Sequence, residues 1–313
     1  MKAVGLTDFG GPDVLQILEL PDPVAGPGQV LIRVHAAAVN PTDALIRSGE
    51  HVRMFGRTAL PPYVPGMDAA GVLEAIGEGV ETDLNIGDRV MAFIAPMGSY
   101  GAYSEMIAVP ANSVVKSPRS LTDVEACTIL MNAMTARVAL DTLDLKPGST
   151  VLVTGAAGTF GGYAVQLAKE AGLVVIADAS EADEPVVAGF GADFVLRRGD
   201  DIASRVREQF PEGVDGAIDG ALLNERLAPA VRDGATVVTL RMYSGDAERG
   251  VKLVPIRSKN HAEEREKLDE LRRLAEEGKL TIRVAGVYPK EQASEAHRRL
   301  EQGGLRGRLV IEF

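Results

Sequence analysis

The residues with the clearest chemical potential are Ala156, Gly158 and Gly161, which reproduce a G-x-G-x-x-G spacing with alanine in its first position. Residues 151–154 before them predict a short buried strand, and apolar residues at helical spacing follow from Ala164. Glycines here let the backbone approach a pyrophosphate, which then lies at a helix N-terminus where N–H groups favour negative charge. The spacing predicts a dinucleotide site, with a purely structural strand–helix turn as the alternative.

Two charged side chains disagree about which dinucleotide binds. Asp178 ends the next predicted strand, where a carboxylate hydrogen-bonds a ribose 2′-hydroxyl and repels a 2′-phosphate. Arg198 ends the strand after that, and a guanidinium fork suits a phosphate. The repulsion from one partly exposed carboxylate is roughly 1 kcal/mol, so a bidentate arginine can outweigh it. We therefore predict NADPH as the cofactor and keep NADH as the alternative.

The whole chain sets the context for these residues. Its 313 residues suffice for two domains with a full core in each. A net charge of −11 argues against nucleic-acid binding. Cys127 is the only cysteine, which excludes a disulfide within the chain and a four-cysteine zinc site. The N-terminus lacks the apolar core of a signal peptide, and polar residues interrupt the longest apolar run, so we expect a cytoplasmic protein without a membrane span.

The elements that position the site follow from the pattern along the chain. The first 118 or so residues predict many short strands separated by glycine and proline, as in a small β-barrel. A helix is predicted from Ser120 or Thr122 to about Leu143, and from residue 151 strands alternate with helices. This alternation indicates a parallel, doubly wound sheet whose binding crevice lies at the carboxyl ends of its strands.

Several further motifs are spread over nearly the whole chain, at residues 39–43, 65–72, 87–90, 101–105, 134–136 and 305–310. With the glycine-rich turn, they resemble the medium-chain dehydrogenase/reductase superfamily and, within it, the zinc-free quinone oxidoreductase (zeta-crystallin-like) group. The resemblance implies an α/β fold with a Rossmann doubly wound parallel sheet inserted between the parts of a β-rich GroES-like catalytic domain. It places the catalytic domain at residues 1–118 and 254–313 and the dinucleotide-binding domain at residues 119–253.

The resemblance also implies individual site residues. Asn40 matches a position that reaches toward the nicotinamide and the substrate, and Thr135 matches a threonine that lines the nicotinamide end. Arg198 stands where relatives have a phosphate-contacting tyrosine. The predicted cofactor contacts are Asn40, Thr135, Gly155, Ala156, Ala157, Gly158, Thr159, Phe160, Gly161, Asp178, Ser180, Arg198, Gly220 and Leu240.

No metal site is predicted. Zinc-dependent relatives carry a cysteine ligand where this chain has Asn40 and Pro41, and the cysteine-rich structural-zinc loop is missing. None of the histidines stands in a ligand pair. A conjugated acceptor needs no Lewis acid, because added hydride spreads charge into an enolate or hydroquinone that hydrogen-bond donors stabilise. The prediction is hydride transfer from NADPH to a quinone or an α,β-unsaturated carbonyl.

His51 is the candidate proton donor. Enoyl-thioester reductases of the superfamily carry a proton-donating tyrosine in the corresponding loop, and histidine titrates near neutral pH. The alternative is a solvent-facing loop histidine, with water as the donor. Tyr63 and Tyr103 either line the pocket or are buried in the barrel.

Two other functions stay open. One is an enoyl-thioester or biosynthetic enone reductase in which His51 donates the proton. The other is a dinucleotide-binding sensor or structural protein without turnover, like the lens crystallins that this family supplied. The expected partner is a small-molecule quinone or enone, with neither nucleic acid nor membrane. A homodimer is the habit of the family.

Overall fold

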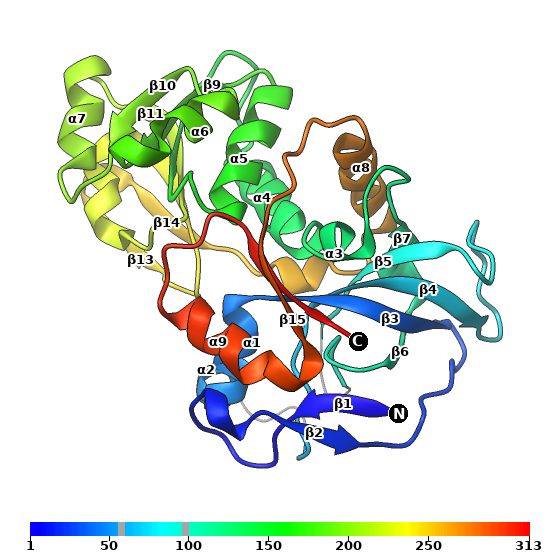
Figure 1. Cartoon of the computed structure of the whole chain (residues 1–313). Coiled ribbons are helices and arrows are strands. Elements are labelled where there is room, and N and C mark those ends of the chain that lie inside the picture. The colour runs from blue at the N-terminus through cyan, green and yellow to red at the C-terminus, as the bar shows by residue number, and fades with distance from the viewer. Residues whose placement is uncertain (56–59, 96–99) are drawn as a thin grey trace. The chain divides into compact units, whose positions relative to one another are not determined.

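The structure is a computed structural model that describes residues 1–55, 60–95 and 100–313 (Figure 1). The chain divides into two compact units. The first unit comprises Met1–Met131, Lys259–Gly278 and Ile282–Phe313, and the second comprises Asn132–Ser258 and Lys279–Thr281. Within the described ranges, no helix is both long and apolar enough to cross a membrane.

The second unit is built on a seven-stranded sheet in the order β10-β9-β8-β11-β12-β14-β13. Neighbouring strands are parallel, except that β13 is antiparallel to β14. The strands are β8 (Thr150–Thr154), β9 (Val174–Ala179), β10 (Phe194–Arg197), β11 (Val214–Asp219), β12 (Val231–Thr239), β13 (Gly245–Asp246) and β14 (Lys252–Pro255). The α-helices are α5 (Thr159–Glu170), α6 (Glu184–Gly189), α7 (Ile202–Gln209) and most of α4 (Leu130–Leu143). The order reverses between β8 and β11, which is where ligands bind in such sheets.

The first unit contains a second sheet in the order β15-β16-β3-β4-β5-β7, with β6 also paired to β3 and a separate β1–β2 pair. All its pairs are antiparallel except β15 with β16. The strands are β1 (Lys2–Gly5), β2 (Gln16–Glu19), β3 (Gln29–Val39), β4 (Asp68–Ile76), β5 (Arg89–Phe93), β6 (Met106–Pro110), β7 (Val114–Lys116), β15 (Val284–Pro289) and β16 (Arg308–Glu312). The α-helices are α1 (Pro41–Ser48), α2 (Glu50–Phe55), α3 (Asp123–Ala126), α8 (Arg265–Glu276) and α9 (Ala293–Glu301).

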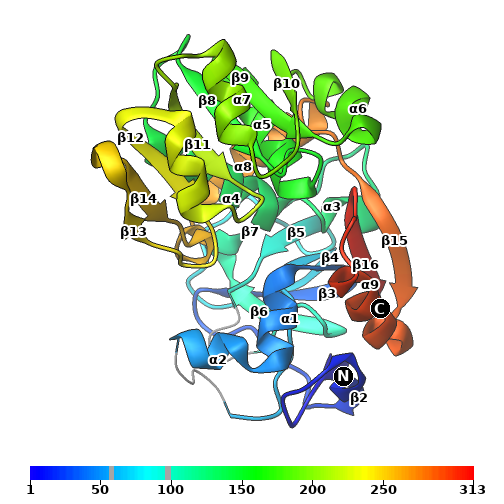
Figure 2. The ribbon, with the colours of Figure 1, turned by 90° about the vertical axis from the view of Figure 1, so that its left-hand side faces the viewer.

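These two sheets confirm the predicted fold class, a parallel Rossmann-type sheet and a GroES-like antiparallel sheet (Figure 2). Strand β3 shows why the first unit folds as it does. Val30, Ile32 and Val34 are buried, whereas the residues between them are more exposed, as expected of a strand with one covered face. From Ala36 to Val39 every residue is buried, so both faces of this end of the strand are covered.

The helix predicted from Ser120 or Thr122 to Leu143 is wrong in one respect, because it is divided into α3 and α4. Thr122 does cap α3 and exchanges hydrogen bonds with Glu125. The Thr128 hydroxyl then donates to the Glu125 carbonyl at 2.7 Å, a local bond that competes with helix continuation. Helix α4 begins anew where an Asp68 carboxylate oxygen accepts the Met131 N–H at 2.8 Å. A cap from another strand was not visible in the local pattern.

The predicted loop around His51 is also wrong. Gly49 ends α1 with φ of 79°, a left-handed conformation that favours glycine. Helix α2 begins at the next residue, Glu50, so His51 lies in the first turn of a short helix. Gly49 was a sequence signal for the end of a helix, but no sequence signal predicted that a second helix begins at Glu50.

Candidate active site

The glycine-rich turn joins β8 to α5 in the second unit. Gly155 has φ of +69°, which favours glycine. A Cβ atom on Gly161 would lie 2.2 Å from the Gly155 carbonyl oxygen, so only glycine lets α5 pack this close to the turn. These two glycines are required by the fold itself.

Gly158 differs from its neighbours because the fold does not require it. It is the N-cap residue of α5, with φ −74° and ψ 171°, a conformation that any residue adopts. A Cβ atom there would meet only the Gly155 carbonyl oxygen, at 3.2 Å, which a small shift relieves. The first-turn N–H groups of a helix have no intrahelical partners and favour anions. The room above Gly158 therefore fits the pyrophosphate of a dinucleotide.

Asp178 and Arg198, which the sequence set against each other, form an ion pair. Asp178 Oδ2 accepts a hydrogen bond from Arg198 Nε at 2.9 Å, and Asp178 Oδ1 accepts one from the Ala156 N–H at 3.1 Å. The Asp178 side chain is 3% exposed and that of Arg198 is 38% exposed. The carboxylate therefore links the glycine-rich turn to the guanidinium, and its charge is compensated inside the protein.

The other predicted residues of the turn gather at the carboxyl ends of β8 and β11. Ala157 and Thr159 are buried, and the Phe160 ring lies against Gly220. A Cβ atom on Gly220 would lie 2.5 Å from the Thr154 carbonyl oxygen and 3.2 Å from Phe160 Cδ1. The close approach of these two strand ends explains why glycine follows β11.

Three predicted contacts lie elsewhere in the second unit. The Ser180 hydroxyl follows β9 and donates to Asp183 Oδ2 at 2.5 Å. Leu240 follows β12 and is half-buried, and its carbonyl accepts the Tyr243 N–H at 3.2 Å. Thr135 is half-buried on α4. Ser180 and Leu240 thus lie at the strand ends where such sheets bind ligands, but the cofactor contacts of all three residues stay predictions.

A cavity of about 340 Å³ opens at the ends of β9 and β10. Its lining includes Glu181, Glu184 and Arg197. Arg197 Nη2 and Glu181 Oε2 lie 2.8 Å apart, and this contact lowers the pKa of Glu181. Both members of the Arg197–Arg198 pair therefore have an acidic neighbour of their own.

Asn40 lies at the junction of β3 and α1 in the first unit and is fully buried. Its Nδ2 donates to Asp68 Oδ2 at 2.7 Å, and its backbone N–H donates to Asp43 Oδ2 at 2.8 Å. Asp43 also accepts the Gly66 N–H at 2.9 Å through its other oxygen. The Asp68 bond orients the Asn40 amide and the Asp43 bonds hold the backbone around it, whereas the predicted contact of Asn40 with the cofactor stays a prediction.

Sequence reasoning missed the two aspartates that hold Asn40. Burial disfavours their charged forms and raises the pKa of Asp43 and that of Asp68 to about 7. Hydrogen bonds from Gly66 and Asn40 oppose this shift at Asp43, and bonds from Met131 and Asn40 oppose it at Asp68. The Asn-Pro-Thr-Asp spacing was a usable signal for Asp43, because a carboxylate three residues after an N-cap reaches back to the cap N–H.

His51 is half-buried on α2. Burial and the positive charge of Lys259 lower its pKa from the usual 6.5. The imidazole is therefore mostly neutral at pH 7, which weakens it as an acid and counts against its predicted role as proton donor.

A second histidine that sequence reasoning assigned no chemistry lies in the core. His297 is fully buried, and burial lowers its pKa to about 3. Its Nε2 lies 3.1 Å from the Tyr103 hydroxyl, and the two rings meet edge to face. Tyr103 is itself fully buried, and Tyr63 stacks on Phe9 with ring centroids 4.7 Å apart. For both tyrosines, burial in the barrel accounts for the position.

Comparison with known proteins decides the family. A model of the alcohol dehydrogenase GroES-like domain matches residues 26–119, and a model of zinc-binding dehydrogenases matches residues 190–311. A quinone oxidoreductase of Pongo abelii is 31% identical over 99% of this chain and 97% of its own length. The chain belongs to the medium-chain dehydrogenase/reductase family, in its quinone oxidoreductase group.

Solved members of this family share the whole fold. The quinone oxidoreductase from Coxiella burnetii superposes with a TM-score of 0.85 at 26% identity, covering 100% of this chain and 99% of its own. A mycobacterial protein solved in complex with NADPH reaches 0.84 at 30% identity and covers 100% of both chains. Membership of the medium-chain dehydrogenase/reductase family supports an NAD(P)H-dependent oxidoreductase.

Zinc is bound by some members of the medium-chain dehydrogenase/reductase family, as the name of one matching model indicates. Among residues 1–55, 60–95 and 100–313, no three His, Cys, Asp or Glu side chains gather as a metal site would require. The one cysteine, Cys127, is buried, and burial raises the pKa of its thiol.

Proposed function

We propose that this protein is a zinc-independent oxidoreductase that transfers hydride from NADPH to a quinone or an α,β-unsaturated carbonyl. The observation that carries the proposal is the glycine-rich turn. Its central glycine, Gly158, leaves room for a phosphate that the fold does not use, and Asp178 joins the same turn to the Arg198 guanidinium. A turn with a purely structural role needs Gly155 and Gly161 but not Gly158.

Different residues of the chain hold different parts of the dinucleotide. The turn from Gly155 to Gly161 and the first turn of α5 hold the pyrophosphate, and Thr135 and Leu240 face the nicotinamide end. When bound, NADPH supplies the hydride. The acceptor must be conjugated, because Asn40 and backbone N–H groups offer hydrogen bonds rather than the stronger polarisation of a metal ion.

Preference for NADPH rests on Arg198. Only Nε of its guanidinium is hydrogen-bonded within the part of the chain that the structure describes, so the two terminal nitrogens are available to a 2′-phosphate. The carboxylate of Asp178 is compensated by Arg198 and by the Ala156 N–H, which reduces its repulsion of that phosphate. A guanidinium held at one edge by a buried carboxylate is preorganised for a bidentate contact at the other.

Asn40 and His51 are the proposed catalytic residues. Asp68 holds the side-chain amide of Asn40, and Asp43 holds its backbone N–H. His51 donates a proton only in its charged form, which its lowered pKa restricts to acidic pH, and water serves above that.

Steady-state reduction of a panel of quinones, enals and enoyl thioesters, each with NADPH and with NADH, tests the proposal. We expect turnover of at least one conjugated acceptor and none of an isolated ketone, with a higher kcat/KM for NADPH. Equal or better rates with NADH would overturn the cofactor assignment. Tight NADPH binding with no oxidation by any acceptor would instead identify a sensor or structural protein, and activity confined to enoyl thioesters would identify an enoyl reductase.

A further inference from the structure

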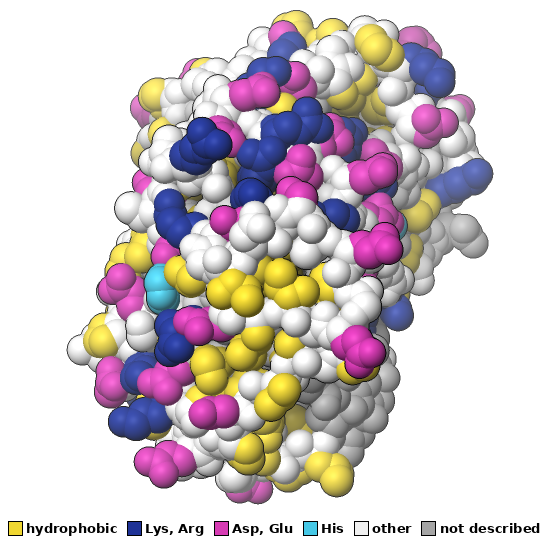
Figure 3. Space-filling view, turned by 90° about the vertical axis from the view of Figure 1, so that its right-hand side faces the viewer, with side chains coloured by type: hydrophobic (Ala, Val, Ile, Leu, Met, Phe, Trp, Pro, Cys, Tyr) yellow, Lys and Arg dark blue, Asp and Glu magenta, His cyan; other side chains and the backbone are white. Residues whose placement is uncertain are grey.

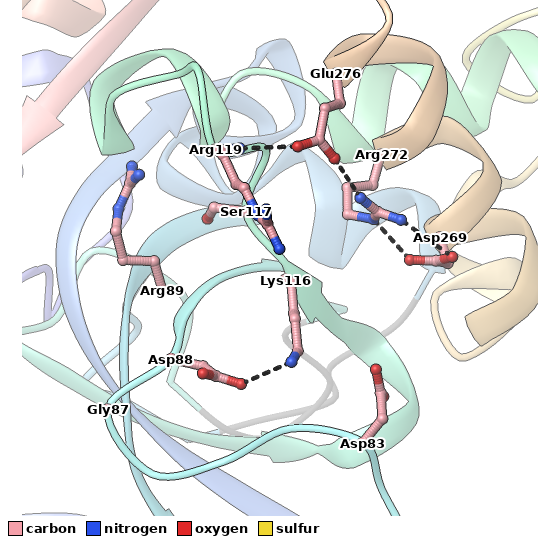
Figure 4. A pocket seen from close by; sticks show the side chains of 10 residues that line it. All are labelled: Asp83, Gly87, Asp88, Arg89, Lys116, Ser117, Arg119, Asp269, Arg272 and Glu276. Carbon is pink, nitrogen blue, oxygen red and sulfur yellow. Dashed lines mark hydrogen bonds and ion pairs between the residues drawn. The ribbon is translucent and has the colours of Figure 1, made fainter.

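A cavity of about 590 Å³ lies within the first unit, where the segments around β5 and β7 face α8 (Figure 4). Gly87 and Asp88 reach it from the turn before β5, and Lys116 and Arg119 from the end of β7 and the segment after it. All its lining residues belong to the first unit, whereas the glycine-rich turn belongs to the second. The function proposed above does not use this cavity.

The carboxylates around the cavity are all engaged. Asp88 pairs with Lys116 at 3.1 Å, and Arg272 pairs with Asp269 at 2.7 Å and with Glu276 at 2.6 Å. The remaining acid, Asp83, pairs with Arg265 at 2.5 Å, and the cation Arg89 pairs with Asp123 at 2.7 Å. The acids and bases of the lining are thus matched, with one exception.

The exception is Arg119. Its backbone N–H donates to Glu276 Oε1 at 3.4 Å, but across the described ranges its guanidinium has neither an ion pair nor a hydrogen bond. Figure 4 shows the side chain extended along the cavity in the direction of Lys116, with no contact drawn from its guanidinium. The Arg119 guanidinium is therefore available to an anion in the cavity, on the same side as the Lys116 ammonium, which already pairs with Asp88.

Ser117 adds a second observation. It lines the cavity wall between these cations, is 8% exposed, and its hydroxyl has no hydrogen-bond partner in the part of the chain that the structure describes. A buried hydroxyl without a partner is unfavourable, and rotation about one bond re-aims it. The oxygen is buried in the structure, so a ligand oxygen in the cavity would satisfy it once the side chain has rotated toward that space.

We propose that this cavity binds a small phosphate monoester, with the phosphate held by Arg119 and Lys116 and by the hydroxyl of Ser117. Arginine and lysine donors together suit a tetrahedral oxyanion, and the cavity is larger than a bare phosphate requires. Asp88 and Glu276 border the same space and disfavour polyphosphates, because added negative charge would meet theirs.

The charge pattern of the surface indicates that the ligand is recognised by contacts within the cavity and not by long-range electrostatic attraction. Figure 3 shows acidic and basic side chains intermingled on one face of the molecule, not a field of one sign. With a net charge of −11, the chain attracts no polyanion from a distance. A ligand is therefore selected by the two cations and by the fit of its organic part.

The test is isothermal titration and phosphorus NMR with two probes, inorganic phosphate and ribose 5-phosphate, on four proteins. The proteins are wild type, Arg119→Gln, Arg198→Gln and Arg306→Gln, the last being an exposed arginine outside the cavity that matches the charge change. We expect Arg119→Gln to weaken binding of ribose 5-phosphate about tenfold or more, with melting temperature unchanged. The Arg306→Gln and Arg198→Gln proteins should bind it at this site as the wild type does.

Other results of the same titrations would overturn the proposed phosphate site or separate it from the cofactor site. Loss of binding only in Arg198→Gln would assign the phosphate to the proposed cofactor site and overturn the second site without affecting the proposed function. Equal binding by Arg119→Gln and wild type would overturn it too. Tighter binding of inorganic phosphate than of the ester would leave an anion site but overturn the ester. Quinone reduction that persists in Arg119→Gln separates this proposal from the function proposed above.

Discussion

The Asp178 carboxylate binds the Arg198 guanidinium at 2.9 Å, with the acid almost fully buried and the base partly exposed. Two residues that favour different dinucleotides when considered singly therefore form one unit. Arg198 compensates the charge of the Asp178 carboxylate, and the two terminal nitrogens of its guanidinium stay available to a ligand. Cofactor preference then depends on the pair, not on the sum of two independent charges.

Replacing Arg198 with Gln should selectively impair NADPH. We expect kcat/KM for NADPH to fall about 10- to 100-fold and that for NADH to change little, because a bidentate charged contact is lost and Asp178 is left without its cation. The measurement is the ratio of the two kcat/KM values with one acceptor. Arg197→Gln is the matched control, since Arg197 pairs with the exposed Glu181. A parallel fall with both cofactors would contradict the assignment.

Two alanine substitutions in the glycine-rich turn should separate binding from folding. Gly158→Ala meets only the Gly155 carbonyl at 3.2 Å, so we expect little change in melting temperature but clearly weaker dinucleotide binding. Gly161→Ala places its Cβ 2.2 Å from the same oxygen, and overpacking of this kind typically costs about 1–3 kcal/mol of unfolding free energy. Thermal unfolding and fluorescence titration with NADPH measure the two effects. Unchanged NADPH binding by Gly158→Ala would argue for a purely structural turn.

The pH dependence of the rate should reveal what His51 does. Its pKa lies below 6.5, so the proton-donating form accumulates only as pH falls through that lowered pKa. We expect His51→Ala to retain most of its kcat at pH 8 and to lose the rise in kcat that the wild type shows toward acid. A positioned general acid contributes about 100-fold or more, so the effect at low pH should be large. Identical pH profiles for both proteins, on every acceptor, would leave water as the only donor.

Stability against pH should report buried groups that act in opposite directions: His297 in one direction, and in the other Asp68 together with Asp43, whose pKa is raised in the same way. The pKa of Asp68 is raised to about 7 in the folded protein, so this carboxyl favours folding at acid pH and its contribution is lost between about pH 4 and 7. The pKa of His297 is lowered to about 3, so its contribution is present above pH 6.5 and is lost as pH falls. The two effects partly cancel in the wild type.

Single variants remove the contribution of one group at a time from the pH dependence. In urea unfolding from pH 4 to 7, Asp68→Asn should make stability rise more steeply with pH than in the wild type, and His297→Gln should make it fall more steeply. The control is Asp13→Asn, which removes an exposed carboxylate at the surface. Curves for both variants that run parallel to the wild type would show that neither group titrates differently on folding.

The separate features of the second unit were readable along the chain because they are local. A buried strand, a turn of small residues and an apolar helical face need only their own few residues to be recognised, and β8, the turn from Gly155 and α5 agree with that pattern. The motif also identified Gly158 and Gly161 together. Only the tertiary structure distinguishes them, because the clash at Gly161 comes from the backbone of a residue across the turn.

The sequence by itself determined the alternation of strands and helices, the family of the chain and the residue types at the glycine-rich turn. The tertiary structure alone decided that Asp178 pairs with Arg198, and that Asp68 holds Asn40 and caps α4. It also decided that the Arg119 guanidinium faces a cavity with no ion pair or hydrogen bond among the described residues. The physical reason is the range of each interaction. Periodicity and turn chemistry act between neighbours in the chain, whereas burial and ion pairing depend on which distant side chains share one space.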